Sequence, residues 1–296
     1  MKYIEKHPLI MIVIGVFGIS LSSILVRYSA APSALTAAWR LLCTVILMTP
    51  VVWGNDRVRK EMTTLNRKTA FLCLISGLFL AIHFAVWFES LQYTSVASST
   101  TIVCTEVIWV SLGFCLLLKG KLSAKAIISI IVTLVGSCLI ALSDSAAGES
   151  NLYGDFLALI AAIAVAVYTL IGRVVRSTVT TTVYTFLVYV SCAVVLVLLC
   201  VYKGYGLFEY GYSGIMIGFF LAIFSTILGH SIFSWCLKYF TPAFVSASKL
   251  CEPVAAAAMA AILFGEGMSL IQIAGGILIL GGVLYYSVAE KQGNES

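Results

Sequence analysis

The stretch "SLQYTSVASSTTIVCTEV" at residues 90–107 aligns without gaps on "CLKYFTPAFVSASKLCEP" at residues 236–253. Both stretches leave one apolar segment, pass a tyrosine in a short turn and enter a second apolar segment that carries a glutamate. The same offset of 146 residues brings together further identical residues, namely Arg27 and Arg173, Leu91 and Leu237, Ser123 and Ser269, and Gly136 and Gly282. The chain therefore divides into two predicted repeats, residues 1–146 and residues 147–296.

The composition is that of an integral membrane protein. Hydrophobic residues make up 61% of the 296 residues and charged residues 10%, with a mean hydropathy of +1.05, whereas soluble domains are about half apolar and a quarter charged. A run of about 20 apolar residues in a helix spans the hydrocarbon core of a bilayer. Ten segments predict an all-α protein with ten transmembrane helices: 9–30, 33–52, 69–90, 94–118, 126–143, 153–173, 179–202, 213–237, 242–264 and 270–288.

The basic residues predict the orientation, because cytoplasmic segments are enriched in lysine and arginine. With both termini inside, fourteen of the eighteen fall on the cytoplasmic side: Lys2, Lys6, Arg57, Arg59, Lys60, Arg67, Lys68, Lys119, Lys121, Lys125, Arg173, Arg176, Lys238 and Lys291. Topology thus accounts for the net charge of +5 without a nucleic-acid partner. Since each repeat has five predicted helices, the second repeat enters the membrane from the opposite side, an arrangement common in secondary transporters.

Several kinds of chemistry find no support in the sequence. The nine cysteines lie in predicted helices, and neither CxxC nor HExxH occurs, so neither a disulfide framework nor a metal site is expected. The first apolar segment has no cleavage site typical of a removable leader. No GxxxxGK[ST] motif is present, and the loops are short. We expect neither an enzyme nor a bound cofactor.

Charged residues within the predicted spans are the main site candidates, since each costs about 2.5 to 3.5 kcal/mol to insert even on a lenient scale. Glu106 lies between Ser99 and Trp109 on one predicted helical face, beside other hydroxyl side chains. It could bind a cation or carry a proton, or it could be a structural glutamate bonded between helices. Lys249 and Glu252 are three residues apart, so they are expected to neutralise each other as an internal ion pair.

Histidine and arginine supply the next candidates. His83 and Trp87 are four residues apart and should face the same way, and His83 could exchange a proton with Glu106. His230 is a weaker candidate for the same role. Arg40 could bind a carboxylate, although it could equally hold helices together.

Aromatic residues complete the predicted solute site. Trp87 and Trp109 around Glu106 would form a box for an ammonium group through cation–π attraction, and Trp39 and Tyr168 are further candidates. Membrane-interface belts are the alternative explanation for some of these side chains. Ser22 and its neighbours in the first helix could line a pore, and Tyr168 is the residue that matches Ser22 in the second repeat.

The sequence "CEPVAAAAMAAILFGEGMS", with Glu252, Pro253 and the Phe264–Gly265–Glu266 corner, resembles the closing motif of the EamA family in the drug/metabolite transporter superfamily. The "AAWRLL" around Arg40, the ten spans and the tandem repeat are similar to that family as well. The first repeat departs from the motif, because Gly120 stands where the second has Glu266 and no proline follows Glu106. The resemblance implies transport of small organic metabolites such as amino acids.

We therefore expect a multi-pass secondary transporter in the plasma membrane that moves an amino-acid-like zwitterion or an organic cation, coupled to protons or to exchange. The alternatives are uptake of choline or another quaternary amine, and a membrane sensor that transports nothing. The expected partners are a small-molecule solute and the lipid bilayer, with a homodimer as an option.

Overall fold

The computed structural model describes residues 8–26, 28–94, 96–144, 152–264 and 269–295. Lys2, Lys6, Arg27 and the Gly265–Glu266 corner lie outside the described residues. The helices in chain order are α2 (Pro8–Val26), α3 (Ser33–Trp53), α4 (Asp56–Thr63), α5 (Arg67–Ser90), α6 (Val96–Cys104), α7 (Glu106–Leu116), α8 (Ala124–Asp144), α9 (Leu152–Val175), α10 (Thr181–Tyr202), α11 (Gly211–Leu221), the π-helix η2 (Ala222–Ser231), α12 (Ile232–Cys236), α13 (Pro242–Lys249), α14 (Glu252–Phe264) and α15 (Leu270–Glu295).

The protein is a multi-pass helical membrane protein, as the composition predicted. Seven helical segments in the described chain are long and apolar enough to cross a membrane, and two shorter apolar helices, Pro8–Ser22 and Ala124–Ile140, accompany them. One helix, or two or three consecutive helices, occupies every segment predicted to span. The count of ten transmembrane helices stays a prediction, because some of these helices are short and others are interrupted. The orientation in the membrane stays a prediction as well.

Two helices are interrupted at matching positions of the predicted repeats. The first interruption is at Thr105, between α6 and α7, and the second is at Leu250 and Cys251, between α13 and α14. In each case the second half-helix begins with a glutamate, Glu106 or Glu252. A carboxylate is favourable there, because the N-terminus of a helix carries a partial positive charge.

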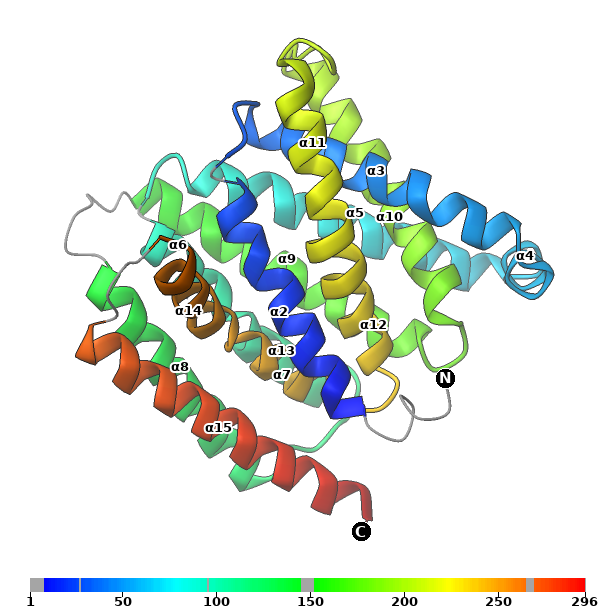
Figure 1. Cartoon of the computed structure of the whole chain (residues 1–296). Helices are drawn as coiled ribbons and strands as arrows, with labels where there is room; N and C mark the ends of the chain where they lie inside the picture. The colour runs from blue at the N-terminus through cyan, green and yellow to red at the C-terminus, as the bar shows by residue number, and fades with distance from the viewer. Residues whose placement is uncertain (1–7, 27, 95, 145–151, 265–268, 296) are drawn as a thin grey trace.

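The helices pack in a pattern that is preserved when the predicted repeats are exchanged. Contacts of α5 with α9, and of α7 with α9, have counterparts in contacts of α2 with η2 and α12, and of α14 with α2. The equivalent helices α8 and α15 pack directly on each other and lie side by side in Figure 1. Their contact is close at Gly136, where a Cβ would stand 2.7 Å from the carbonyl oxygen of Gly275. Glycine therefore permits this helix contact.

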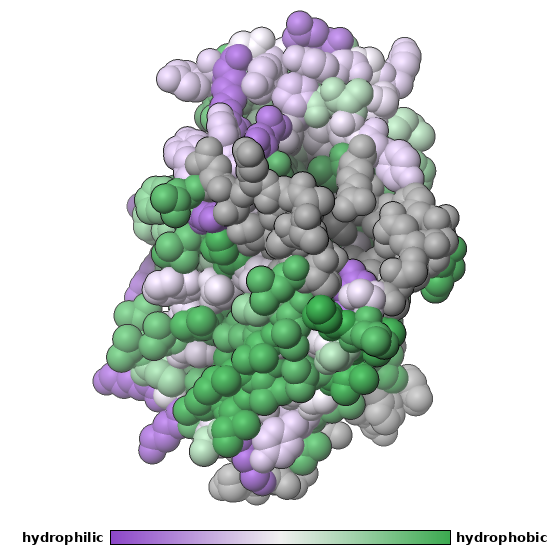
Figure 2. Space-filling view, turned by 90° about the vertical axis from the view of Figure 1, so that its left-hand side faces the viewer, coloured by the Kyte–Doolittle hydropathy of each residue, from purple (hydrophilic) through white to green (hydrophobic). Residues whose placement is uncertain are grey.

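Two large clusters of buried apolar side chains form the interior. One joins α3, α5, α9 and α10, and the other joins α2, α8, α12, α13 and α15. The outer face of α8 and α15 is apolar as well, with Ile131 and Ile277 more than half exposed. Figure 2 shows this hydrophobic surface, which covers the lower part of the face drawn. An exposed apolar face of this kind suits the hydrocarbon of a bilayer.

The basic link between α3 and α5 contains a short helix that the sequence did not predict. Asn55 caps α4, since its side-chain oxygen accepts hydrogen bonds from the amides of Arg57 and Val58 at 3.0 and 3.3 Å. The Glu61 carboxylate accepts two hydrogen bonds from the backbone N–H and the hydroxyl of Thr180, each 2.7 Å long. The link is thus held against the start of α10.

Candidate binding cavity

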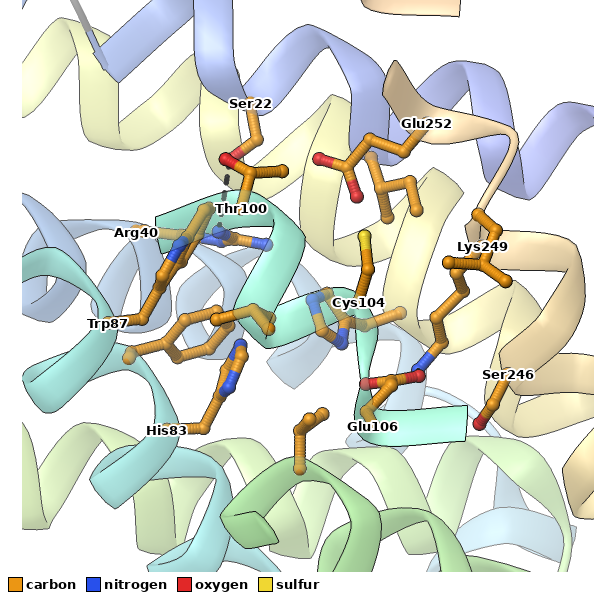
Figure 3. Close-up of a pocket in the computed structure, with 16 residues that line it drawn as sticks. Ser22, Arg40, His83, Trp87, Thr100, Cys104, Glu106, Ser246, Lys249 and Glu252 are labelled. Atoms are coloured by element: carbon orange, nitrogen blue, oxygen red, sulfur yellow. Dashed lines mark hydrogen bonds and ion pairs between the residues drawn. The ribbon is translucent and has the colours of Figure 1, made fainter. Parts of the chain in front are cut away.

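A cavity lies where the interrupted helices meet the two apolar clusters. Its lining comes from both predicted repeats and combines charged, polar and apolar side chains: Ile19, Ser22, Arg40, His83, Phe84, Trp87, Thr100, Val103, Cys104, Glu106, Val165, His230, Ser246, Lys249, Leu250 and Glu252. Figure 3 shows Arg40, His83 and Trp87 on one side of the cavity, and Glu252, Lys249, Ser246 and Glu106 towards the other.

Lys249 forms an ion pair with Glu106, not with Glu252 as the sequence suggested. Its Nζ lies 2.9 Å from Glu106 Oε1, and the two side chains are only 14% and 7% exposed. The expected pair relied on a continuous helix, but the interruption at Leu250 and Cys251 separates Lys249 at the end of α13 from Glu252 at the start of α14. The pair that does form joins the first predicted repeat to the second.

Glu252 lines the cavity without a partner for its carboxylate. Among the described residues, its side chain makes neither an ion pair nor a hydrogen bond, although its backbone carbonyl accepts a 3.3 Å hydrogen bond from Ser20 Oγ. Figure 3 shows the carboxylate extending into the cavity from the start of α14. A carboxylate in this position is available to a cationic group or a proton.

Arg40 is the other unpaired charge in the cavity. Its side chain on α3 is 1% exposed, and its Nε donates a 2.7 Å hydrogen bond to the hydroxyl of Thr226 on η2. Its Nη1 donates a long hydrogen bond of 3.5 Å to Ser22 Oγ, and its guanidinium carbon lies 4.5 Å from the centre of the Phe84 ring. No carboxylate of the described chain forms a salt bridge with it.

His83 and Trp87 face the cavity together, as their spacing on α5 predicted. Their rings stack with centroids 5.8 Å apart, and His83 Nδ1 lies 3.0 Å from the carbonyl oxygen of Ala161 on α9. His83 therefore contacts the α9 backbone and not Glu106, the proton partner that the sequence suggested. The buried Nε1 of Trp87 has no hydrogen-bond partner within the described chain.

His230 lies between the rings of Phe84 and Tyr168, at centroid distances of 5.4 and 6.3 Å. His230 lines the cavity. Tyr168 does not, and its hydroxyl shares a 2.8 Å hydrogen bond with the hydroxyl of Ser234. Tyr168 therefore contacts a lining side chain but does not itself line the cavity.

Two of the predicted tryptophans lie elsewhere. Trp39 donates a 2.9 Å hydrogen bond from Nε1 to the carbonyl oxygen of Leu207. Trp109 packs in a small apolar cluster with Ala166 and Leu170 of α9. The expected box of Trp87 and Trp109 around Glu106 is not formed, because Trp109 packs against α9 and does not line the cavity.

The repeat offset relates lining residues of the first repeat to lining residues of the second. Adding 146 to a lining residue of the first repeat often gives another lining residue: Ile19 and Val165, Phe84 and His230, Thr100 and Ser246, Val103 and Lys249, Cys104 and Leu250, and Glu106 and Glu252. Thr100, Cys104 and Ser246 were not singled out from the sequence. Their pairing with matched positions shows that the same surface of each repeat forms the cavity.

Comparison with known proteins agrees with this architecture. The EamA-like transporter family model matches the chain twice, at residues 7–142 and 152–288. An uncharacterized transporter from Clostridium kluyveri is 24% identical over 256 residues, which is 84% of this chain and 82% of the relative. A solved crystal structure covers 97% of this chain and 98% of its own, with a TM-score of 0.79 and 15% identity. At that identity the likeness to the solved structure concerns the fold alone.

Proposed function

Because the chain belongs to the EamA-like transporter family, we propose that it is a secondary transporter for a small amino-acid-like zwitterion. The solute would enter the cavity between the two repeats and cross the plasma membrane by alternating access. Transporters built from two repeats commonly bind their solute at the interface between the repeats.

The charge balance of the cavity carries this proposal. Arg40 and Lys249 supply two positive charges, and Glu106 and Glu252 supply two negative charges. Lys249 and Glu106 neutralise each other, so one charge of each sign stays unpaired. A zwitterion brings one charge of each sign and pairs both, whereas an organic cation such as choline would leave Arg40 unpaired.

Alternating access requires the contacts between the repeats to rearrange. The Lys249–Glu106 pair links α13 to α7, and both helices end or begin at an interruption. Transporters of this build commonly have broken helices at the solute site and alternate access by rocking one repeat or bundle against the other. The pair is thus placed to hold one state of the cycle.

The energy source in this proposal is a proton gradient or exchange with a second solute. Glu252 is a better candidate proton carrier than Glu106, because its carboxylate has no partner in the described residues. A proton on Glu252 would compete with the ammonium group of the solute for the carboxylate. This competition would couple proton movement to solute movement. Transport in vesicles should then respond to an imposed pH gradient, and Glu252→Gln should remove the response.

The experiment that tests the function is a thermal-shift screen of the purified protein, followed by flux in vesicles. A ligand that binds the folded protein stabilises it by mass action. Neutral amino acids should raise the melting temperature, and choline should not. Stabilisation by choline alone would favour uptake of a quaternary amine, and binding without flux of any bound solute would favour a sensor.

A further inference from the structure

The cavity lining departs from the repeat symmetry at four positions of the first repeat. Ser22, Arg40, His83 and Trp87 line the cavity. The residues that the offset assigns to them are Tyr168, Phe186, Gly229 and Phe233, and none of these lines it. The first-repeat side of the cavity therefore carries polar groups that the second-repeat side lacks.

These extra groups are rich in hydrogen-bond donors. Arg40 has five N–H donors, of which the described residues satisfy one well, at Thr226, and one weakly, at Ser22. The Trp87 indole N–H is buried without a partner, and an indole nitrogen can only donate. A buried donor without an acceptor is unfavourable, so this side of the cavity calls for an acceptor from outside the chain.

The donors belong to one continuous patch. Arg40 stacks on Phe84, Phe84 lies 5.2 Å from the His83 ring, and His83 stacks on Trp87. Figure 3 shows Arg40 and Trp87 on the same side of the cavity, across from the Glu252 carboxylate. Donors on one wall of the cavity suit the oxygens of a carboxylate, for which arginine is the preferred partner.

We propose that Arg40 and the Trp87 indole N–H form a subsite for the carboxylate of the solute, and that Glu252 on the opposite wall receives its ammonium group. This assignment rests on the proposed function, and it fixes the orientation of the solute. The acid end binds the first repeat and the amine end binds the second, so the bound solute bridges the two halves.

The apolar lining defines suitable probes. Ile19, Val103, Val165 and Leu250 line the cavity between the charged groups, so L-leucine offers an apolar side chain together with both charged ends. L-Leucinamide keeps the ammonium group and lacks the carboxylate. Their binding to the full chain in detergent can be measured by calorimetry, which gives the preference for the carboxylate as a ratio of dissociation constants.

Trp87→Phe is the decisive variant, because it removes the N–H and keeps an aromatic ring. It should weaken L-leucine binding about 10-fold and leave L-leucinamide binding unchanged, since hydrogen bonds to charged groups contribute a factor of this order or more. Trp109→Phe is the matched control, because its buried indole N–H is also unpartnered but lies outside the cavity lining. It should change neither constant.

Arg40→Lys and Glu252→Gln complete the test. The lysine variant keeps the charge and loses the planar donor pair, so the preference for L-leucine over L-leucinamide should fall. Glu252→Gln should weaken both ligands alike, because both carry the ammonium group.

Equal effects of the two tryptophan variants, with the parent protein still preferring L-leucine to L-leucinamide, would overturn the subsite while leaving zwitterion transport intact. Equal binding of L-leucine and L-leucinamide to the parent protein would overturn the proposed zwitterion as well as the subsite. Binding of choline with no binding of any amino acid would overturn both the subsite and the proposed function.

Discussion

In the first repeat the interrupted helix breaks at Thr105, just before Glu106, and in the second it breaks at Leu250 and Cys251, just before Glu252. Proline follows the glutamate only in the second repeat, as Pro253, whereas Val107 takes its place in the first. The first repeat breaks at the matching position without a proline, so a break at this position does not require one. The cavity, where both breaks occur, is the common feature.

The two breaks differ more in chemistry than in geometry. Lys249 stands three residues before Glu252, and the matching residue before Glu106 is Val103. The single lysine pairs with the glutamate of the other repeat. One glutamate thus becomes part of a contact between the repeats, and the carboxylate of the other has no partner among the described residues.

A second pair of equivalent helical segments, in α5 and η2, also differs between the repeats. The segment of α5 at residues 76–85 is α-helical, whereas its counterpart in the second repeat is the π-helix η2. Thr226 of η2 accepts the hydrogen bond from Arg40 Nε, and the matching residue in α5 is Leu80. Wider helical turns of this kind occur frequently at functional sites. Small differences between the repeats therefore make the two walls of the cavity unlike.

The largest expected difference between the repeats is their direction through the membrane. Thr64 and Tyr210 are 146 residues apart and occupy matching loops. Cysteines introduced as Thr64→Cys and Tyr210→Cys, each in a background without the native thiols, should be labelled from opposite sides, the first from inside. Labelling of both from one side would show that the repeats are parallel.

The next largest effect concerns the ion pair that joins the repeats. Lys249→Ala leaves Glu106 buried without a partner, which should lower the free energy of unfolding by about 3 to 5 kcal/mol. The double variant with Glu106→Ala should recover much of that loss, whereas the double variant with Glu252→Ala should not. Thermal unfolding of the four proteins measures this, and the opposite pattern would restore the pair within one repeat that the sequence suggested.

A smaller effect should separate the two glutamates. Glu252→Gln removes a carboxylate without a partner in the described chain, so it should weaken L-leucine binding by roughly 10-fold or more at little change in stability. Glu106→Gln leaves Lys249 unpaired, so its main effect should be a loss of stability and not a loss of L-leucine binding. Dissociation constants and melting temperatures of both variants make the comparison, and equal profiles would mean that both glutamates have the same role.

The smallest effect is expected at the proline. Pro253 lies in the first turn of α14, where its fixed φ is tolerated and its missing N–H is not needed. If the break does not depend on it, Pro253→Ala should change stability by less than about 1 kcal/mol and preserve transport. A large loss of transport would indicate that the second repeat, unlike the first, needs proline to keep its helix interrupted.

The charged and ionisable residues of the candidate site could be predicted from residue type alone. Arg40, His83, Glu106, Lys249 and Glu252 stand out because charged and ionisable residues are rare in apolar spans, and all of them line the cavity. Trp39 and Trp109 were poorer predictions, since aromatic residues occur both in cavities and in packing. Phe84 and Val103 could have been found from the repeat offset, because they match the candidates His230 and Lys249. Thr100 and Ser246 match each other, so neither could be found in this way.

The sequence by itself determined the membrane class, the helical segments, the family and the charged residues of the site, because each follows from local hydropathy or from matches along the chain. The tertiary structure decided which charges are paired. Lys249 and Glu252 are neighbours in sequence, but the break between them places them on two different helices, α13 and α14. Lys249 pairs instead with Glu106, which is 143 residues away along the chain. Pairing depends on how broken helices meet across the repeats, and spacing along one helix contains no information about that contact.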